Sequence, residues 1–452
     1  MAESLDLQGR WWLPGHDEHK VPGHLTWDPI AGGELQLLGH LRPDEWKNNV
    51  RPDGSVQTVS NRRVQARDDH NYPIIHGQSG SKAYTLLDNF STKRSQNVLA
   101  DRAKESVYVN RILEATTWFT DLADPGFDRA VVELRHLTAW VGQNGINVTY
   151  PDATDAENDV FAVVNAERVP RLDARHDDGT VSLTQRLRVT GDHLHAVGLE
   201  QRCDVSFAYP EARSLAYLSE VASNVQDLVT IALGKPANFD GFRLEHPELP
   251  LRSFTGSVLG DYREQIRYYA RWSNGSEDIE PVSRDKMYFR FEDIGGTQGL
   301  ERWLQVAADY RSELSRAMAT RYNKAMYVED RIMNICAVLE SFDIVRRGGK
   351  ANYIDRVKEC IRFAGEPFTA LIGNNVNAWA DTVKDLRHDL AHHRDKFRQN
   401  TANVTLLLSE QLFWLFALCI LRLSDAPEAV FQAIAKHPQI RWIASEAERD
   451  ES

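Results

Sequence analysis

The first part of the chain, up to about residue 295, consists of short apolar runs separated by Gly, Pro, Asp and Asn. Runs of this kind, with a period of two residues, are typical of strands. We therefore expect strands over Leu35–Leu38, Val131–Val141, Val181–Val189 and Met287–Phe291. The stretch RLRVTGDHLHAV predicts a hairpin, because a Gly-Asp pair separates two alternating runs.

One helix is expected inside this β-rich part, because apolar residues recur at helical spacing over Glu211–Leu233. The acidic, turn-like run Asp152–Asp159 is a candidate seam between two subdomains.

After Gly295 and Gly296 the spacing of apolar residues becomes helical throughout. The expected helices are Leu300–Tyr322, Met326–Phe342, Tyr353–Phe363, Val376–Phe397 and Thr405–Leu423, and Pro427 is expected to open a final one. The sequence therefore predicts an α+β, multidomain fold. A β-rich N-terminal region over residues 1–295 would be followed by an all-α helical bundle over residues 299–445.

Composition places the chain among globular proteins, because 42 % of its 452 residues are hydrophobic. Its formal net charge of −12 argues against a protein that coats nucleic acid, so any RNA contact needs a local basic patch. The four cysteines form no CxxC pair, which fits a reducing, cytoplasmic location. The most apolar run, Leu412–Leu421, is short for a membrane span, and we see no signal peptide pattern, so no membrane association is expected.

The segment AWADTVKDLRHDLAHHRDKF carries the candidate chemistry. Arg387 and His392 form an R-x4-H pattern within a helical repeat. A histidine titrates near neutral pH, so it can serve as general base on a ribose 2′-hydroxyl or as general acid on a leaving 5′-oxygen. An arginine can hold the phosphate and stabilise the charge that builds on its non-bridging oxygens. The pair is therefore suited to cleaving RNA without a metal.

The same spacing also occurs at Arg171 and His176, in a polar loop, and at Arg188 and His193, across the expected turn. Only the third occurrence lies in a continuous helical pattern. Positions i and i+5 lie ~140° apart around a helix, so the site of one copy would be open. Two copies that meet across a two-fold axis would close it, which favours a dimer.

The segment LRHDLAHH resembles the signature of the HEPN superfamily (higher eukaryotes and prokaryotes nucleotide-binding), and EDRIMNICAVLESFD resembles the earlier helices of that domain. The whole chain resembles the ApeA-like branch of bacterial anti-phage proteins. In that branch a β-rich N-terminal part, which begins with a segment like GRWWLPG, precedes the HEPN domain.

The resemblance implies a metal-independent endoribonuclease without a cofactor, acting as a toxin in abortive infection. It implies RNA as substrate, with tRNA as a target, a phage-derived activator sensed by the N-terminal region, and a homo-oligomer that is at least a dimer through the HEPN domain. Arg387 and His392 take the catalytic positions, and His388 takes the polar position after the arginine. Glu340 is the residue that would orient Arg387.

A local basic patch is expected around a Gly-Gly loop. Arg346, Arg347 and Lys350 surround this loop, and Arg394 continues the segment that carries the motif. If the helical part binds RNA, these four residues are the expected RNA-binding residues. Ordinary solvated charge is the alternative explanation for them.

Two other functions stay open. His388 and His392 lie four residues apart and share a helix face, so they could bind zinc with Glu410 as third ligand, as in a zinc-dependent hydrolase. The helical part could also be a HEPN module that binds RNA or nucleotide without cleaving it. The plainest interpretation of the segment is a solvated helix face with internal ion pairs.

Overall fold

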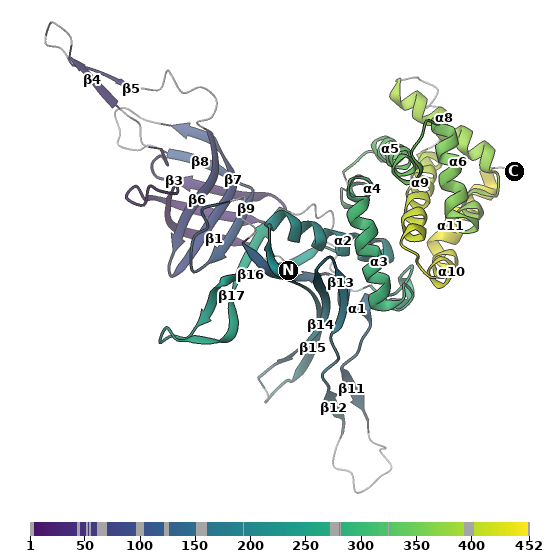
Figure 1. Ribbon diagram of the computed structural model, residues 1–452, viewed down its shortest axis with the longest axis horizontal. Helices are drawn as coiled ribbons and strands as arrows, with labels where there is room; N and C mark the ends of the chain where they lie inside the picture. Colours follow the sequence, from purple (N-terminus) through teal and green to yellow (C-terminus); the bar gives the residue numbers. More distant parts are fainter. Residues whose placement is uncertain are drawn as a thin grey trace. The chain divides into compact units, whose positions relative to one another are not determined.

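The computed structural model describes residues 4–42, 46–50, 53, 56–60, 70–95, 104–121, 126–150, 161–192, 194–271, 280, 282–323, 325–392 and 402–450. The chain forms two compact units. Unit 1 comprises Met1–Val132, Tyr209–Leu215 and Phe239–Trp272, and unit 2 comprises Glu133–Ala208, Ala216–Asn238 and Ser273–Ser452. Strands dominate the first part of the chain and helices the last part (Figure 1). The predicted α+β, multidomain fold is therefore confirmed.

Six antiparallel strands of unit 1 close into a barrel. In the order of their hydrogen-bonded neighbours they are β7 (Lys82–Ser95), β6 (Asn71–Ser79), β1 (Leu5–Trp12), β2 (Val21–Asp28), β3 (Gly32–Leu37) and β8 (Lys104–Val109). The barrel closes because β8 also pairs with β7. Apolar side chains alternate with polar ones along these strands, so one face of each strand points inward.

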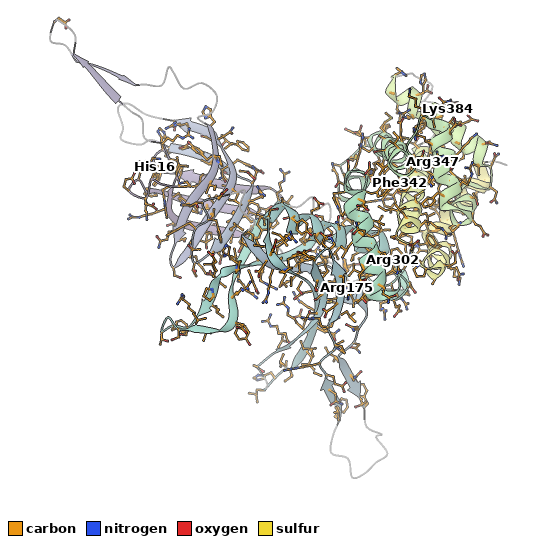
Figure 2. The ribbon with its side chains drawn as sticks, in the orientation of Figure 1. His16, Arg175, Arg302, Phe342, Arg347 and Lys384 are labelled. Atoms are coloured by element: carbon orange, nitrogen blue, oxygen red, sulfur yellow. The ribbon has the colours of Figure 1, made fainter. Side chains whose placement is uncertain are left out.

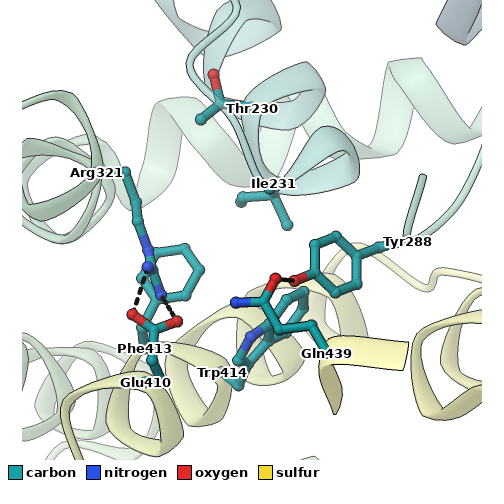
Figure 3. Close-up of a pocket in the computed structure, with 9 residues that line it drawn as sticks. Thr230, Ile231, Tyr288, Arg321, Glu410, Phe413, Trp414 and Gln439 are labelled. Atoms are coloured by element: carbon teal, nitrogen blue, oxygen red, sulfur yellow. Dashed lines mark hydrogen bonds and ion pairs between the residues drawn. The ribbon is translucent and has the colours of Figure 1, made fainter. Parts of the chain in front are cut away.

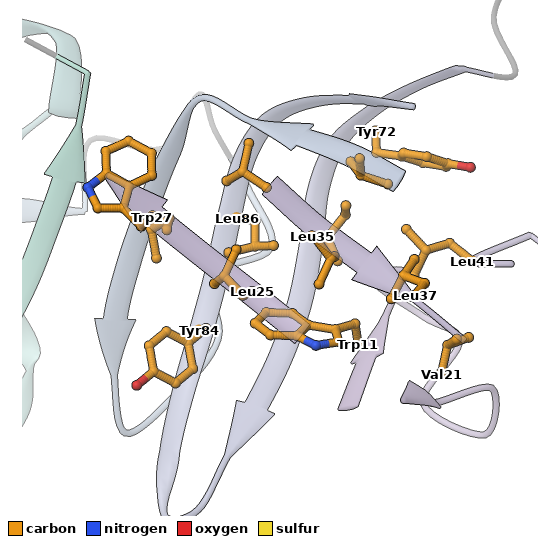
Figure 4. Packing of buried hydrophobic residues seen from close by; sticks show 14 of the residues in the cluster. Trp11, Val21, Leu25, Trp27, Leu35, Leu37, Leu41, Tyr72, Tyr84 and Leu86 are labelled. Atoms are coloured by element: carbon orange, nitrogen blue, oxygen red, sulfur yellow. The ribbon is translucent and has the colours of Figure 1, made fainter. Parts of the chain in front are cut away.

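The interior of the barrel is filled by large apolar side chains, among them Trp11 and Trp27, which are 0 % and 3 % exposed (Figure 4). The rings of Trp11 and Tyr84 lie 6.3 Å apart. Gly77 makes room for Trp11, because a Cβ on Gly77 would lie only 2.1 Å from that ring. A glycine is therefore required here for close packing rather than for backbone freedom.

The remaining strands of unit 1 extend the sheet from β7. The order continues through β9 (Arg111–Ala115) to β17 (Val258–Ala270) and β16 (Phe239–Arg252). β10 (Phe127–Leu134) follows β16 in the same order, and its Asp128 forms an ion pair with Arg263 of β17. β4 (Trp46–Val50) and β5 (Val56–Ser60) form a separate hairpin.

In unit 2 three antiparallel strands pair in the order β13 (Leu172–His176), β14 (Gly179–Thr190) and β15 (Gly198–Arg213), and the end of β15 from Tyr209 onward belongs to unit 1. A hairpin forms here, but its connection is longer than predicted: β14 ends at Thr190 and β15 begins at Gly198, so Leu194–Val197 lies in the connection and not in a strand. The other short elements are α1 (Leu137–Val141), β11 (Ile146–Thr149), β12 (Val163–Ala166) and the 3₁₀ turn Arg284–Lys286.

The helices of unit 2 are α2 (Leu215–Leu233), α3 (Gly296–Asp309), α4 (Arg311–Tyr322), α5 (Val328–Arg347), α6 (Tyr353–Ala364), α7 (Glu366–Thr369), α8 (Val376–Ala391), α9 (Ala402–Leu423), α10 (Glu428–Lys436) and α11 (Pro438–Asp450), with a 3₁₀ turn at Ala370–Ile372. Two residues tie α2 to the later helices. Arg311 donates hydrogen bonds to Asn224 and Asp227 of α2, and the indole of Trp303 donates to the carbonyl of Asn224.

The most apolar helix, α9, is the centre of this bundle. Its segment Val404–Leu423 is long and apolar enough to cross a membrane by those two measures, but 83 % of it is buried inside the unit, as in the core helix of a folded domain. At its polar edge Glu410 accepts two hydrogen bonds from Arg321, at 2.7 and 2.9 Å (Figure 3). The adjoining cavity of about 20 Å³ has the size of a water molecule.

Three predicted elements are corrected by the structure. The strand predicted over Val131–Val141 ends at Leu134 and is followed by α1. Met287–Phe291 is a buried connection and not a strand, because its apolar residues pack against the helices instead of pairing in a sheet. The single helix predicted over Leu300–Tyr322 is two helices, which meet at Tyr310.

Candidate active site at the end of helix α8

The motif lies on α8, whose buried side is apolar. Trp379, Val383 and Leu386 are buried on this side, and the indole of Trp379 donates a 2.8 Å hydrogen bond to Gln411 of α9. Asn375 caps the start of α8 by accepting from the backbone N–H of Ala378. These contacts fix the rotation of α8 and leave its opposite side, with the motif, toward solvent.

Two neighbours hold Arg387. Its guanidinium donates a 2.8 Å hydrogen bond to Glu340 of α5, and it lies 4.1 Å from the ring centre of Tyr353 at the start of α6. The side chains of Arg387 and Glu340 are 35 % and 34 % exposed, so the pair is still accessible to a ligand. The structure therefore places Glu340 against Arg387, where the resemblance expects it.

Tyr353 is a site residue that the sequence analysis missed. Its hydroxyl is buried against the thiol of Cys336, and burial raises the pKa of both groups, that of Cys336 to about 11. The tyrosine is therefore a neutral, anchored ring beneath the guanidinium. No local pattern signals this role, because Tyr353 reads as an ordinary first residue of an amphipathic helix.

His392 lies just past the end of α8. The helix ends at Ala391, and the backbone N–H of His392 closes it by donating to the carbonyl of His388. The predicted continuation of the helix to Phe397 falls on residues 393–400, which lie outside the described residues. Both imidazoles are exposed, with ring centres 4.5 Å apart. The two histidines thus form an open pair at a helix end.

The other R-x4-H pairs have different surroundings. His176 ends β13, is buried and packs against the ring of Tyr217, while Arg171 pairs with Asp173. His193 lies outside the described residues. Among the residues that the structure describes, Arg387 and His392 are therefore the only such pair whose arginine lies on a helix.

The expected RNA-binding residues divide into two kinds. Arg346 and Arg347 both pair with Asp343, a carboxylate with a fully buried side chain, and both lie within 4.0 Å of Glu359. Arg356 joins Asp343 from the other side at 3.0 Å. These arginines therefore have structural partners within the bundle. Figure 2 labels Arg347 at the end of α5.

Lys350, by contrast, is exposed in the Gly-Gly loop after α5. Arg394 lies outside the described residues. For these two residues RNA binding stays a prediction.

The ligand set of the zinc alternative does not assemble among the described residues. Glu410, its third ligand, binds Arg321 through both carboxylate oxygens. Within the part of the chain that the structure describes, no group of three or more His, Cys, Asp or Glu side chains is placed to hold a metal ion. A catalytic zinc needs three protein ligands, so the described residues do not fit one.

Comparison with known proteins identifies the N-terminal part. The family model described as ApeA N-terminal domain 1 matches residues 6–303, well over half of the chain. No curated protein and no solved structure matches the chain. The matched range includes the barrel, the strands β13 to β15 and the helix α2, whose Asn224 and Asp227 bind Trp303 and Arg311 of the later helices. The chain therefore belongs to the ApeA-like family of anti-phage proteins.

Proposed function

We propose that this protein is a metal-independent endoribonuclease of the HEPN type, which acts on host RNA in abortive infection. The observation that carries the proposal is the fixed position of Arg387. Glu340 and Tyr353 hold its guanidinium on the exposed side of α8, five residues before an exposed histidine. Arg422 of the same unit also has a carboxylate and an aromatic ring as partners, so it is the combination of a held arginine with exposed histidines at one helix end that supports the proposal.

The proposed reaction uses the two residue types in distinct roles. The imidazole of His392 removes the proton of a ribose 2′-hydroxyl, or donates one to the leaving 5′-oxygen. The 2′-oxygen attacks phosphorus and the bond to the 5′-oxygen breaks. A 2′,3′-cyclic phosphate remains at the 3′ end of the upstream fragment, and the downstream fragment leaves with a 5′-hydroxyl. Arg387 binds the non-bridging oxygens, whose negative charge grows in the transition state. His388 lies 4.5 Å from His392, ring centre to ring centre, and is the second group that can exchange a proton.

A second copy of the chain completes the site in this proposal. Both imidazoles are exposed, so the described residues of one copy leave the site open to solvent. A two-fold axis beside α8 would bring two arginines and two histidine pairs together. RNA, with tRNA as a target, is the proposed substrate, and a phage-derived activator acting on the N-terminal part is the proposed trigger.

The test is cleavage of total bacterial RNA by the purified full chain in excess EDTA, with and without phage lysate. We expect wild-type protein with lysate to cut RNA, to lose no activity in EDTA, and to leave cyclic phosphate ends. His392→Ala should lower the rate by about 10²–10⁴-fold, the usual contribution of a general acid or base.

Abolition of cleavage by EDTA would contradict the proposal and favour a metal-dependent hydrolase. Specific RNA binding without any cleavage would instead favour the non-catalytic binding module. For this outcome the lysate must come from a phage that triggers the protein in cells. Cleavage at the wild-type rate by His392→Ala would reject the site.

Tyr353 should behave as a positioning residue for Arg387. We expect Tyr353→Leu to lower kcat by about 10–100-fold with little change in KM, because a displaced guanidinium fails in the transition state more than in binding. Tyr353→Phe keeps the ring and should restore most of the rate. Initial rates on one defined RNA would measure both effects.

Phe431→Leu is the matched control, since Phe431 lies beneath Arg422 at 3.9 Å in the same unit. That variant should lose stability without losing kcat. If Tyr353→Phe is as slow as Tyr353→Leu, the ring is not what positions Arg387.

A further inference from the structure

A pocket of about 170 Å³ opens beside the barrel in unit 1. Strands β7, β9, β10 and β16 each contribute to it, and most of its lining is apolar or aromatic, including Leu87, Leu113, Trp118, Phe119, Phe127 and His246. An engineered cavity of ~150 Å³ lined by apolar side chains binds benzene, so a space of this size holds one ring and not a whole nucleotide.

The aromatic wall of this pocket is held in place by hydrogen bonds to the barrel. The indole of Trp118 donates to the carbonyl of Gly77 at 2.7 Å. The backbone N–H of Phe119 donates to the hydroxyl of Thr85, and the carbonyl of Phe119 lies 3.1 Å from Nε2 of His76. A wall that is already fixed loses little conformational freedom when a guest binds, which favours recognition.

Three aromatic rings of the pocket wall pack against one another. Phe119 lies 5.7 Å from Phe127, and the ring of His246 stands at 89° to that of Phe127 with 6.1 Å between centres. Tilted and edge-to-face arrangements of this kind favour contact with another aromatic ring.

His246 adds one directed hydrogen-bond donor. Its Nδ1 accepts the backbone N–H of Glu248 at 3.1 Å, so the ring proton is on Nε2. A Cβ on Gly126 would lie 3.4 Å from that Nε2, so the glycine leaves this edge of the ring open. The lining contains no Lys or Arg and includes Asp121, so a phosphate group would find no cation there.

We infer that this pocket binds one uncharged aromatic ring that carries a hydroxyl group, as a tyrosine side chain does. Its ring would fill the aromatic space, and its hydroxyl oxygen would accept the hydrogen bond from Nε2 of His246. The inference gives unit 1 a recognition site and does not depend on nuclease activity.

The test uses the purified full chain and ligand-observed saturation-transfer NMR. The probes are N-acetyl-tyrosine-amide, the phenylalanine and leucine equivalents, and adenosine monophosphate. We expect saturable binding of the tyrosine probe, several-fold weaker binding of the phenylalanine probe and at least tenfold weaker binding of the other two. Thr120, an exposed lining residue, is changed to Trp to fill the space, and this variant should bind the tyrosine probe at least tenfold more weakly.

His246→Phe tests the hydrogen bond separately, since it keeps a ring in the wall. It should bind the tyrosine and phenylalanine probes equally. Unchanged binding to Thr120→Trp, with its melting temperature near that of wild type, would overturn the inference. So would preference for adenosine monophosphate, which would make the pocket a nucleotide site, or the absence of binding by every probe.

Discussion

Replacing Arg387 by alanine is expected to abolish protection against phage while leaving the fold intact. In the proposed mechanism the guanidinium of Arg387 stabilises the transition state. Loss of one such hydrogen-bond donor usually lowers the rate by about 10²–10³-fold. Its ion pair with Glu340 is partly exposed, so the loss in unfolding free energy should stay below about 1 kcal/mol. Plaque counts in cells and RNA cleavage by the purified variant measure the first effect, and thermal unfolding measures the second.

Arg422 offers a close control in the same unit. Its side chain is 30 % exposed, pairs with Glu428 at 3.1 Å and lies 3.9 Å from the ring centre of Phe431. These surroundings resemble those of Arg387, but no histidine pair adjoins them among the described residues. Arg422→Ala should therefore keep wild-type protection. Equal loss in both variants would mean that protection responds to stability alone.

Replacing Asp343 by alanine is expected to have the largest effect on stability. Its fully buried carboxylate is shared by Arg346, Arg347 and Arg356, and the side chain of Arg356 is only 5 % exposed. Removing one partner of a buried ion pair leaves a charge without compensation, which typically costs 3–5 kcal/mol. Urea unfolding followed by circular dichroism would show the loss.

Low pH should reduce the difference in stability between wild type and a variant that lacks the Asp343 carboxylate. Burial alone would raise the pKa of Asp343, but hydrogen bonds from Arg347 and Arg356 lower it below its ordinary value. The stabilisation is therefore complete above the unfolded pKa of ~3.9 and is lost as pH falls through the lower folded pKa. The stability difference between wild type and Asp343→Asn should therefore begin to shrink below about pH 4 and should vanish only once the pH lies below the folded pKa. Asp381→Ala, which breaks an exposed pair with Lys384, should change stability little at any pH.

The local pattern predicted the helices well, because many of them bury one apolar side in the bundle. It predicted their ends less well. The helix expected from Glu211 begins at Leu215, since β15 continues to Arg213. The break at Tyr310 was missed because the spacing of apolar residues continues across it. Met287–Phe291 reads as a strand because it is buried, and burial alone does not distinguish a strand from a packed connection.

The candidate site was predicted only as far as one segment can show it. Arg387 lies on α8 and His392 is the residue that follows its last turn, so their spacing is visible in the sequence. Tyr353 and the sharing of Asp343 depend on contacts between helices that only the folded bundle brings together. Glu340 was found through the resemblance, not through its surroundings.

The two units are interleaved along the chain, and this restricts how the helical part could be separated from the N-terminal part. Glu133–Ala208 and Ala216–Asn238 belong to unit 2 although stretches of unit 1 precede and follow them. A cut near residue 295 would remove α2, and with it the acceptors of Arg311 and Trp303. Proteolysis or internal translation initiation at that point would yield a bundle with exposed, unsatisfied groups. Any activity of the helical part is therefore expected to require synthesis of the whole chain.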